Sequence, residues 1–177
     1  MQRIVFSGFG GQGVLTLGQF VATLAMKNGK YVTWMPSYGA EMRGGTANCT
    51  VIVSDSTIGS PIANCIDILV AMNEPSIEKF ANQMEIKSHV FINSSMVKKP
   101  ELNESINIIE IDATAIAANL GNTKVANMVM LAGFLQTTNF FTMQDVINML
   151  EQKFGKKYPH LIPINIKAIE QGMKVYN

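Results

Sequence analysis

Charged side chains are scarce in this sequence. Asp, Glu, Lys and Arg make up 15% of the 177 residues, against roughly 25% in a typical soluble domain. The formal net charge is +1, which does not suggest a protein that binds nucleic acid or an anionic membrane. A surface so poor in charge indicates either that partners cover part of it or that Ser, Thr and Asn side chains form much of it.

Cysteine and histidine are also rare, with two of each. Cys49 and Cys65 form no metal-binding pattern, and their apolar neighbours predict buried thiols. An iron–sulfur cluster generally has about four cysteine ligands, so we do not expect this chain to hold one alone. His89 and His160 have no nucleophile near them in sequence, and we interpret both as structural. Neither a catalytic triad nor a metal site is predicted.

Long apolar segments are missing as well. The longest, residues 125–135, includes Asn127 and is too short to cross a bilayer, which takes about 20 residues. The N-terminal residues resemble a strand and lack the pattern of a signal peptide. We therefore expect a cytoplasmic protein.

A glycine-rich turn stands out near the N-terminus, with the sequence S-G-F-G-G-Q-G at residues 7–13. Gly8, Gly10 and Gly13 give the pattern G-x-G-x-x-G. The apolar residues before it predict a strand, and apolar residues at helical spacing after it predict a helix over 12–27. Such a turn presents backbone N–H groups where the helix dipole favours an anion.

Each glycine of the turn has an expected role. Gly8 and Gly10 would let the backbone approach a phosphate, and Gly13 would let the helix pack closely on the strand. Gly10 is expected to have a positive φ or to lie against the ligand. A dinucleotide site normally adds an acidic residue about 20 positions further on, and residues 28–35 contain none. A turn that uses glycine only for packing is the alternative.

A second segment, S-Y-G-A-E-M-R-G-G at residues 37–45, should leave the sheet beside the glycine turn. It follows a predicted strand over 31–35, and ligands of open α/β sheets bind at the carboxyl ends of the strands. Arg43 offers a planar donor group for phosphate or carboxylate, unless it is solvated or paired with Glu41. Glu41 could act as a base, although holding Arg43 or a loop amide is the simpler role. The candidate ligand-binding residues are Gly8, Gly10, Gly11, Gln12, Gly13, Ser37, Tyr38, Glu41, Arg43 and Gly44.

The rest of the chain alternates predicted strands with predicted helices and ends in helices, which indicates an α/β fold. The strand predicted over 47–54 alternates apolar and polar residues, so it could lie at a sheet edge or meet a partner subunit. Asp112 and Thr123 are predicted helix caps, and Thr142 with Asp145 resembles a capping box. Further strands are predicted over 66–72, 89–93 and 106–111.

The two motifs, in this order and spacing, resemble the gamma subunit of 2-oxoacid:ferredoxin (acceptor) oxidoreductases. The resemblance continues through residues 67–71 and 120–122 and covers essentially the whole chain, although Ala40 stands where family members often carry proline. It implies a Rossmann-like, mostly parallel doubly wound sheet with extra C-terminal helices, in a single domain over 1–177.

The resemblance also implies a function. Such enzymes oxidatively decarboxylate a 2-oxoacid with coenzyme A, with 2-oxoglutarate favoured here over pyruvate, branched-chain and indolepyruvate substrates, and pass electrons to ferredoxin. Alpha and beta subunits would hold thiamine diphosphate, and a delta subunit or ferredoxin would hold the iron–sulfur clusters. The gamma chain, inactive alone, would contribute coenzyme A binding and assembly of the hetero-oligomer, with homodimer contacts also allowed. An independent NAD- or flavin-binding oxidoreductase and a pure interaction module are the alternatives.

Overall fold

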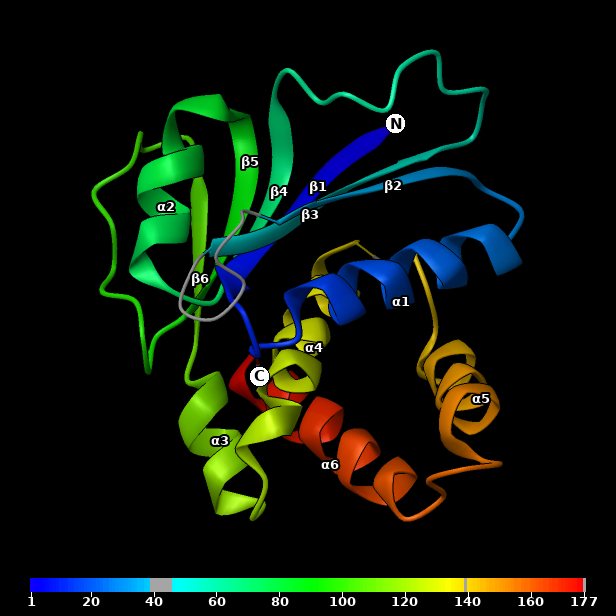
Figure 1. Cartoon of the computed structure of the whole chain (residues 1–177). Coiled ribbons are helices and arrows are strands. Elements are labelled where there is room, and N and C mark those ends of the chain that lie inside the picture. Colours follow the sequence, from blue (N-terminus) through cyan, green and yellow to red (C-terminus); the bar gives the residue numbers. More distant parts are fainter. Residues whose placement is uncertain (39–45, 139, 177) are drawn as a thin grey trace.

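A six-stranded mixed sheet forms the centre of the computed structural model, which describes residues 1–38, 46–138 and 140–176. The strand order is β2-β3-β1-β4-β5-β6 (Figure 1). Three neighbouring pairs are parallel, and β3 runs antiparallel to both β1 and β2. This confirms the predicted α/β fold with a mostly parallel sheet. The strands are β1 (Gln2–Phe9), β2 (Tyr31–Tyr38), β3 (Thr46–Ser54), β4 (Ile66–Ala71), β5 (Met84–Asn93) and β6 (Asn107–Ile111).

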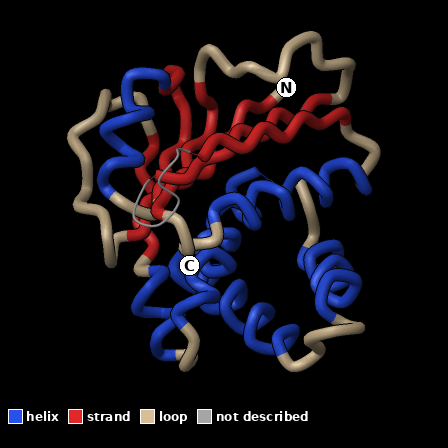
Figure 2. The backbone as a smooth tube through the Cα atoms, viewed as in Figure 1, coloured by secondary structure: helices blue, strands red, loops and turns tan. Residues whose placement is uncertain are grey.

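Helices cover both faces of the sheet, as Figure 2 shows. Alternate residues of β1 enter two cores: Ile4 and Phe6 pack in the larger one with α1 and α4, and Val5 packs in the smaller one with Ile77 of α2. No helix in the described ranges is long and apolar enough to cross a membrane. The helices are α1 (Val14–Lys27), α2 (Glu74–Phe80), α3 (Ala113–Asn119), α4 (Ala126–Thr138), α5 (Met143–Phe154) and α6 (Leu161–Met173), with 3-10 turns η1 (Ala81–Gln83), η2 (Thr123–Val125) and η3 (Lys174–Tyr176).

The strand predicted over 47–54 does not lie at a sheet edge, which was one of its two expected positions; contact with a partner stays a prediction. β3 lies between β2 and β1, so that Val53 pairs with Val32 on one side and with Gln2 on the other. Two of its polar side chains, Asn48 and Ser54, are buried. Alternating polar residues suggested a solvated face, but small polar groups also fit inside a protein when their partners are nearby.

Several element boundaries differ from the predictions. The first helix begins at Val14, which leaves Gln12 and Gly13 in the turn before it. The strand predicted over 89–93 begins at Met84, and the one predicted over 31–35 continues through Tyr38. The division of the chain into a single domain over 1–177 remains a prediction.

The predicted helix caps were confirmed at one of three helix starts. Thr142 and Asp145 form the capping box at the start of α5. Asp112 precedes α3 but makes no side-chain capping bond; its carboxylate accepts a hydrogen bond from the Ser95 hydroxyl. The 3-10 turn η2 is capped by Asn122 and not by Thr123. The side-chain oxygen of Asn122 accepts a hydrogen bond from the backbone nitrogen of Lys124 at 3.1 Å.

The two cysteines differ in their surroundings. Cys49 is buried, and burial raises the pKa of its thiol to about 12. Cys65 is only partly buried and contacts the guanidinium of Arg3, which also pairs with Asp67 at 2.8 Å. The prediction of a buried thiol therefore holds for Cys49 and is wrong for Cys65, because the apolar residues around Cys65 in sequence do not enclose it.

Candidate functional site at the glycine turn

The turn between β1 and α1 takes its shape from two glycines with positive φ. Gly11 has a φ of 98° and Gly13 has a φ of 75°, a region that residues with a side chain adopt only with strain. Gly10 does not have a positive φ, so the other expected role, contact with the ligand, stays a prediction. A Cβ on Gly11 would meet no atom within 4 Å, so this glycine has an open face.

Gln12 holds the turn against the neighbouring strand. Its Oε1 accepts a hydrogen bond from the backbone nitrogen of Phe9 at 2.6 Å, and its Nε2 donates one to the carbonyl of Met72 at 3.1 Å. Met72 directly follows β4. Gln12 therefore connects the ends of two parallel strands.

Gly8 and Gly13 are packed against the protein itself. A Cβ on Gly8 would lie 2.6 Å from Oε1 of Gln12 and 2.8 Å from Cβ of Met72. A Cβ on Gly13 would lie 2.5 Å from Nδ2 of Asn127 in α4. Close packing thus gives both glycines a structural role, while the phosphate approach expected at Gly8 and the close helix–strand packing expected at Gly13 stay predictions.

The second predicted segment starts beside the turn. Gly8 and Tyr38 pair with Ala47 of β3 from opposite sides, and neighbouring strands lie about 4.8 Å apart. The backbone of Tyr38 therefore lies about 10 Å from that of Gly8, and Ser37 before it is exposed. Glu41, Arg43 and Gly44 lie outside the described residues, so their roles stay predictions.

A cavity of about 240 Å³ opens at the turn. Its walls come from the turn, the segments after β4 and β5, the start of α3, and η2 with the first residue of α4. Lys124 supplies the one charge among the described lining residues. The lining residues are Gly11, Gln12, Met72, Met96, Thr114, Thr123, Lys124 and Ala126.

Thr114 is held in place by Asn93, a fully buried residue at the end of β5. Nδ2 of Asn93 donates to the hydroxyl of Thr114 at 2.9 Å, and its Oδ1 accepts from the backbone nitrogen of Thr114 at 3.2 Å. Sequence reasoning did not name Thr114 or Lys124 as site residues. The one signal in the sequence for this part of the site was Asn93, a polar residue at the end of the strand predicted over 89–93.

The chemistry of this cavity suits an anion. The backbone nitrogen of Gly11 has no acceptor among the described residues, the N-terminus of α1 is adjacent, and Lys124 adds a positive charge. In the described part of the chain, no three His, Cys, Asp or Glu side chains lie close enough to hold a metal ion. A dinucleotide site fits less well, because β3 separates β1 from β2 and moves the end of β2, where the ribose-binding acid normally stands, one strand away.

Comparison with known proteins decides the family. Residues 3–175 match the sequence profile of pyruvate ferredoxin/flavodoxin oxidoreductases. The chain belongs to this family. It is 33% identical over 172 residues to the ketoisovalerate oxidoreductase subunit VorA of Methanothermobacter marburgensis. The matched region covers 96% of this chain and 35% of VorA. It is 31% identical over 181 residues to the 2-oxoglutarate synthase subunit KorC of the same organism, across 98% of this chain and 96% of KorC.

Solved structures share the fold. The 2-oxoglutarate:ferredoxin oxidoreductase of Magnetococcus marinus matches with a TM-score of 0.90 at 22% identity, over 98% of this chain and 30% of that one. The gamma subunit of a keto/oxoacid ferredoxin oxidoreductase from Geobacter sulfurreducens matches with a TM-score of 0.81 at 24% identity, over 99% and 98% of the two chains. The chain therefore spans nearly the whole of some of the proteins it matches and about a third of others.

Proposed function

We propose that this chain is the gamma subunit of a 2-oxoacid:ferredoxin oxidoreductase and that coenzyme A binds at the cavity beside the glycine turn. The observation that carries the proposal is the meeting of Gly11, with its open face, and Lys124 in one cavity at the carboxyl edge of the sheet. The Magnetococcus enzyme with the same fold was solved with 2-oxoglutarate, coenzyme A and succinyl-CoA bound.

The cavity fits a phosphate-bearing part of coenzyme A. Its diphosphate and 3′-phosphate are anions that backbone N–H groups and an ammonium can bind. The cavity measures about 240 Å³, below the range of about 300–1,000 Å³ for whole small-molecule sites. One phosphate group and its neighbours would enter, and the rest of coenzyme A would lie against a partner subunit. Arg43 would add a second cation if its loop reaches the same edge.

The assembled enzyme would convert a 2-oxoacid and coenzyme A to acyl-CoA and carbon dioxide, with two electrons passing to ferredoxin. Thiamine diphosphate, which supplies the carbanion chemistry when bound, would belong to the alpha and beta subunits. The clusters would belong to a delta subunit or to ferredoxin. Because relatives carry this domain either alone or joined to further domains, a role in contact with those partners is the expected one.

The 2-oxoacid is proposed to be 2-oxoglutarate, since the KorC relative matches over nearly its full length. A branched-chain oxoacid is the next candidate because of the VorA relative. We also propose that the assembly works in the cytoplasm.

Purification of the native complex through a tag on this chain tests the proposal. We expect thiamine-binding and cluster-bearing chains to co-purify, and the complex to reduce a viologen dye with one 2-oxoacid only when coenzyme A is present. The isolated chain should show no turnover. Turnover by the isolated chain, or the absence of such partners from an active complex, would overturn the subunit assignment.

A further inference from the structure

The hydroxyl group of Thr114 carries a hydrogen that has no acceptor in the described part of the chain. Thr114 is the second residue of α3, lines the cavity at the glycine turn and is half-buried. A threonine hydroxyl offers one donor hydrogen and two acceptor lone pairs. What this hydroxyl can offer a ligand therefore depends on how its neighbours use the oxygen.

Asn93 determines the role of the hydroxyl through the direction of two hydrogen bonds. The backbone nitrogen of Thr114 can only donate, so the atom of Asn93 that lies 3.2 Å from it must be the amide oxygen. The amide nitrogen of Asn93, 2.9 Å from Oγ1 of Thr114, must then donate to that oxygen. Asn93 is fully buried, so water does not compete for these bonds. Oγ1 of Thr114 is therefore an acceptor toward Asn93, and its own hydrogen cannot be directed there.

The neighbouring polar groups at the start of α3 are already used within the protein. The backbone nitrogen of Ala115 donates to Oγ of Ser95 at 3.2 Å, and the carboxylate of Asp112 accepts from the Ser95 hydroxyl. The backbone nitrogen of Thr114 is taken by Asn93. Of these groups, the Thr114 hydroxyl is the one that keeps a donor hydrogen for a ligand in the cavity.

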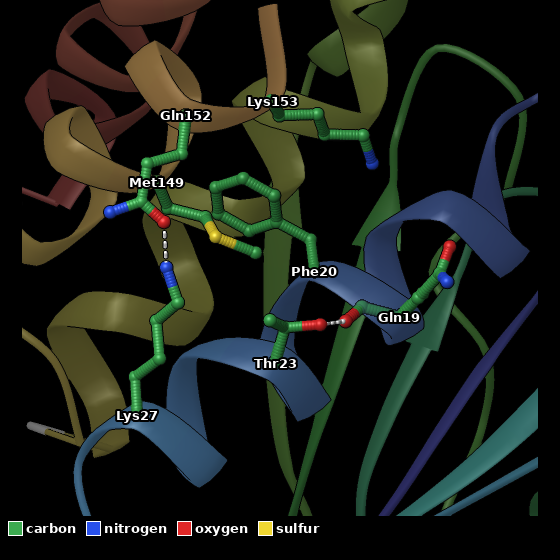
Figure 3. A pocket seen from close by; sticks show the side chains of 7 residues that line it. All are labelled: Gln19, Phe20, Thr23, Lys27, Met149, Gln152 and Lys153. Atoms are coloured by element: carbon green, nitrogen blue, oxygen red, sulfur yellow. Dashed lines mark hydrogen bonds between the residues drawn. The ribbon is translucent and has the colours of Figure 1, made fainter.

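Thr23 of α1 shows the opposite arrangement. It is also half-buried, and it lines a second cavity, of about 370 Å³, between α1 and α5. Its hydroxyl donates to the backbone carbonyl of Gln19 at 2.7 Å, one turn earlier in the helix (Figure 3). Such a bond within the helix is common for threonine. The hydroxyl hydrogen of Thr23 is therefore used, whereas that of Thr114 is not.

We infer that Thr114 is a binding residue for coenzyme A, with its hydroxyl hydrogen donated to a phosphate oxygen, and that Asn93 is the positioning residue that keeps this hydroxyl a donor. The inference rests on the function proposed above and adds two residues to its site. The hydroxyl would act together with the Gly11 backbone N–H and the Lys124 ammonium, which share the cavity. Lysine acts on an anion as a point charge, whereas a hydroxyl held by Asn93 requires an acceptor atom in one place.

Calorimetric titration of coenzyme A onto the assembled complex tests the role of Thr114. Thr114→Val replaces the hydroxyl with a methyl group and should weaken coenzyme A binding about 10-fold, as expected for the loss of a hydrogen bond to a charged group. Thr114→Ser keeps the hydroxyl and should bind nearly as tightly as wild type. Thr23→Val is the matched control and should leave the affinity unchanged, because the hydroxyl it removes donates within its own helix.

A double-mutant cycle tests the role of Asn93. Asn93→Ala should weaken coenzyme A binding in the wild-type background, because the Thr114 hydroxyl is then free to turn away from the ligand. In the Thr114→Val background the same change should weaken binding no further. A merely structural role would lower the affinity in both backgrounds. If Thr114→Val does not assemble, Thr114→Cys replaces it, since a thiol donates only a weak hydrogen bond.

Three results would overturn the inference. If Lys124→Gln weakens coenzyme A binding and Thr114→Val does not, coenzyme A occupies the cavity without the Thr114 hydroxyl, and the proposed function stands. Additive effects of Asn93→Ala and Thr114→Val would mean that Asn93 does not act through Thr114. If neither Lys124→Gln nor Thr114→Val changes the affinity, coenzyme A binds elsewhere, and the inference fails together with the proposed site.

Discussion

The side-chain amide of Asn127 donates a hydrogen bond to the carbonyl of Gly13 at 3.3 Å and thereby joins α4 to the glycine turn. Asn127 is 6% exposed, and a Cβ on Gly13 would lie only 2.5 Å from its Nδ2. The turn therefore depends on a helix more than 100 residues later in the chain. This contact positions the open face of Gly11 for the proposed ligand.

Asn127→Ala should destabilise the protein and weaken coenzyme A binding together. The change removes a hydrogen bond at a buried position, which costs about 1–2 kcal/mol in the free energy of unfolding. Asn165→Ala is a matched control, because Asn165 is buried to a similar degree and bonds the carbonyl of Leu161 at 2.7 Å within α6. Denaturant unfolding should give similar losses for both variants, whereas calorimetry should find weaker coenzyme A binding only for Asn127→Ala. Similar binding by both would argue against a supporting role for Asn127.

Gly11→Ala should affect the ligand more than the fold. Both Gly11 and Gly29 have positive φ, 98° and 74°, and a Cβ on either would meet no atom within 4 Å. Each alanine variant should therefore lose about 1–2 kcal/mol from backbone strain alone. Gly29 follows the far end of α1, so only Gly11→Ala should raise the coenzyme A KM of the assembled enzyme. An equal KM for the two variants would mean that the turn is structural only.

The ion pair between Arg3 and Asp67 should make the free energy of unfolding decrease in acid. Burial raises the pKa of Asp67, but hydrogen bonds from the side chain and backbone of Arg3, at 2.7–2.9 Å, outweigh burial and lower it. A carboxyl whose pKa is lower when folded contributes stability above its unfolded pKa of about 3.9 and loses it as the pH falls through the folded value. The stability difference between wild type and Asp67→Asn should therefore be full near pH 6 and shrink below about pH 4. A difference that stays constant down to about pH 2.5 would contradict this assignment.

The two thiols should differ in reactivity. The Cys49 thiol is buried, with a pKa raised to about 12, and alkylation requires the thiolate. Iodoacetamide at about pH 8 should therefore label Cys65 and spare Cys49 until the protein unfolds, as read by peptide mass spectrometry. A hydrogen bond with Glu85 raises the pKa of Cys65, so its labelling should also be slow. Equal labelling of both in native buffer would show that the core around Cys49 opens readily.

Signals carried by neighbouring residues were read correctly from the sequence. The Thr142–Asp145 capping box depends on a few consecutive residues, and the order of strand, glycine turn and helix at the N-terminus was also predicted. The place of β3 was not predictable in the same way, because the order of strands depends on contacts between distant segments. Its buried Asn48 resembles a solvated residue when only the sequence pattern is considered.

The candidate site shows the same division. Gly11 and Gln12 were predicted from one local motif, and both line the cavity. Lys124 joins them only because α4 packs against the sheet and brings η2 to the same edge. No short-range pattern around Lys124 indicates that position, which is why the sequence alone could not identify this charge.

Calorimetric titration of coenzyme A onto the assembled complex, with Lys124→Gln compared with wild type, tests the central claim most directly. Lys167→Gln, which removes an exposed lysine of α6, serves as the control. If coenzyme A binds at the cavity, Lys124→Gln should weaken it about 10-fold, or about 1.4 kcal/mol, while Lys167→Gln should not and the KM for the 2-oxoacid should stay unchanged. An intact Lys124→Gln complex that binds coenzyme A as tightly as wild type would contradict the account.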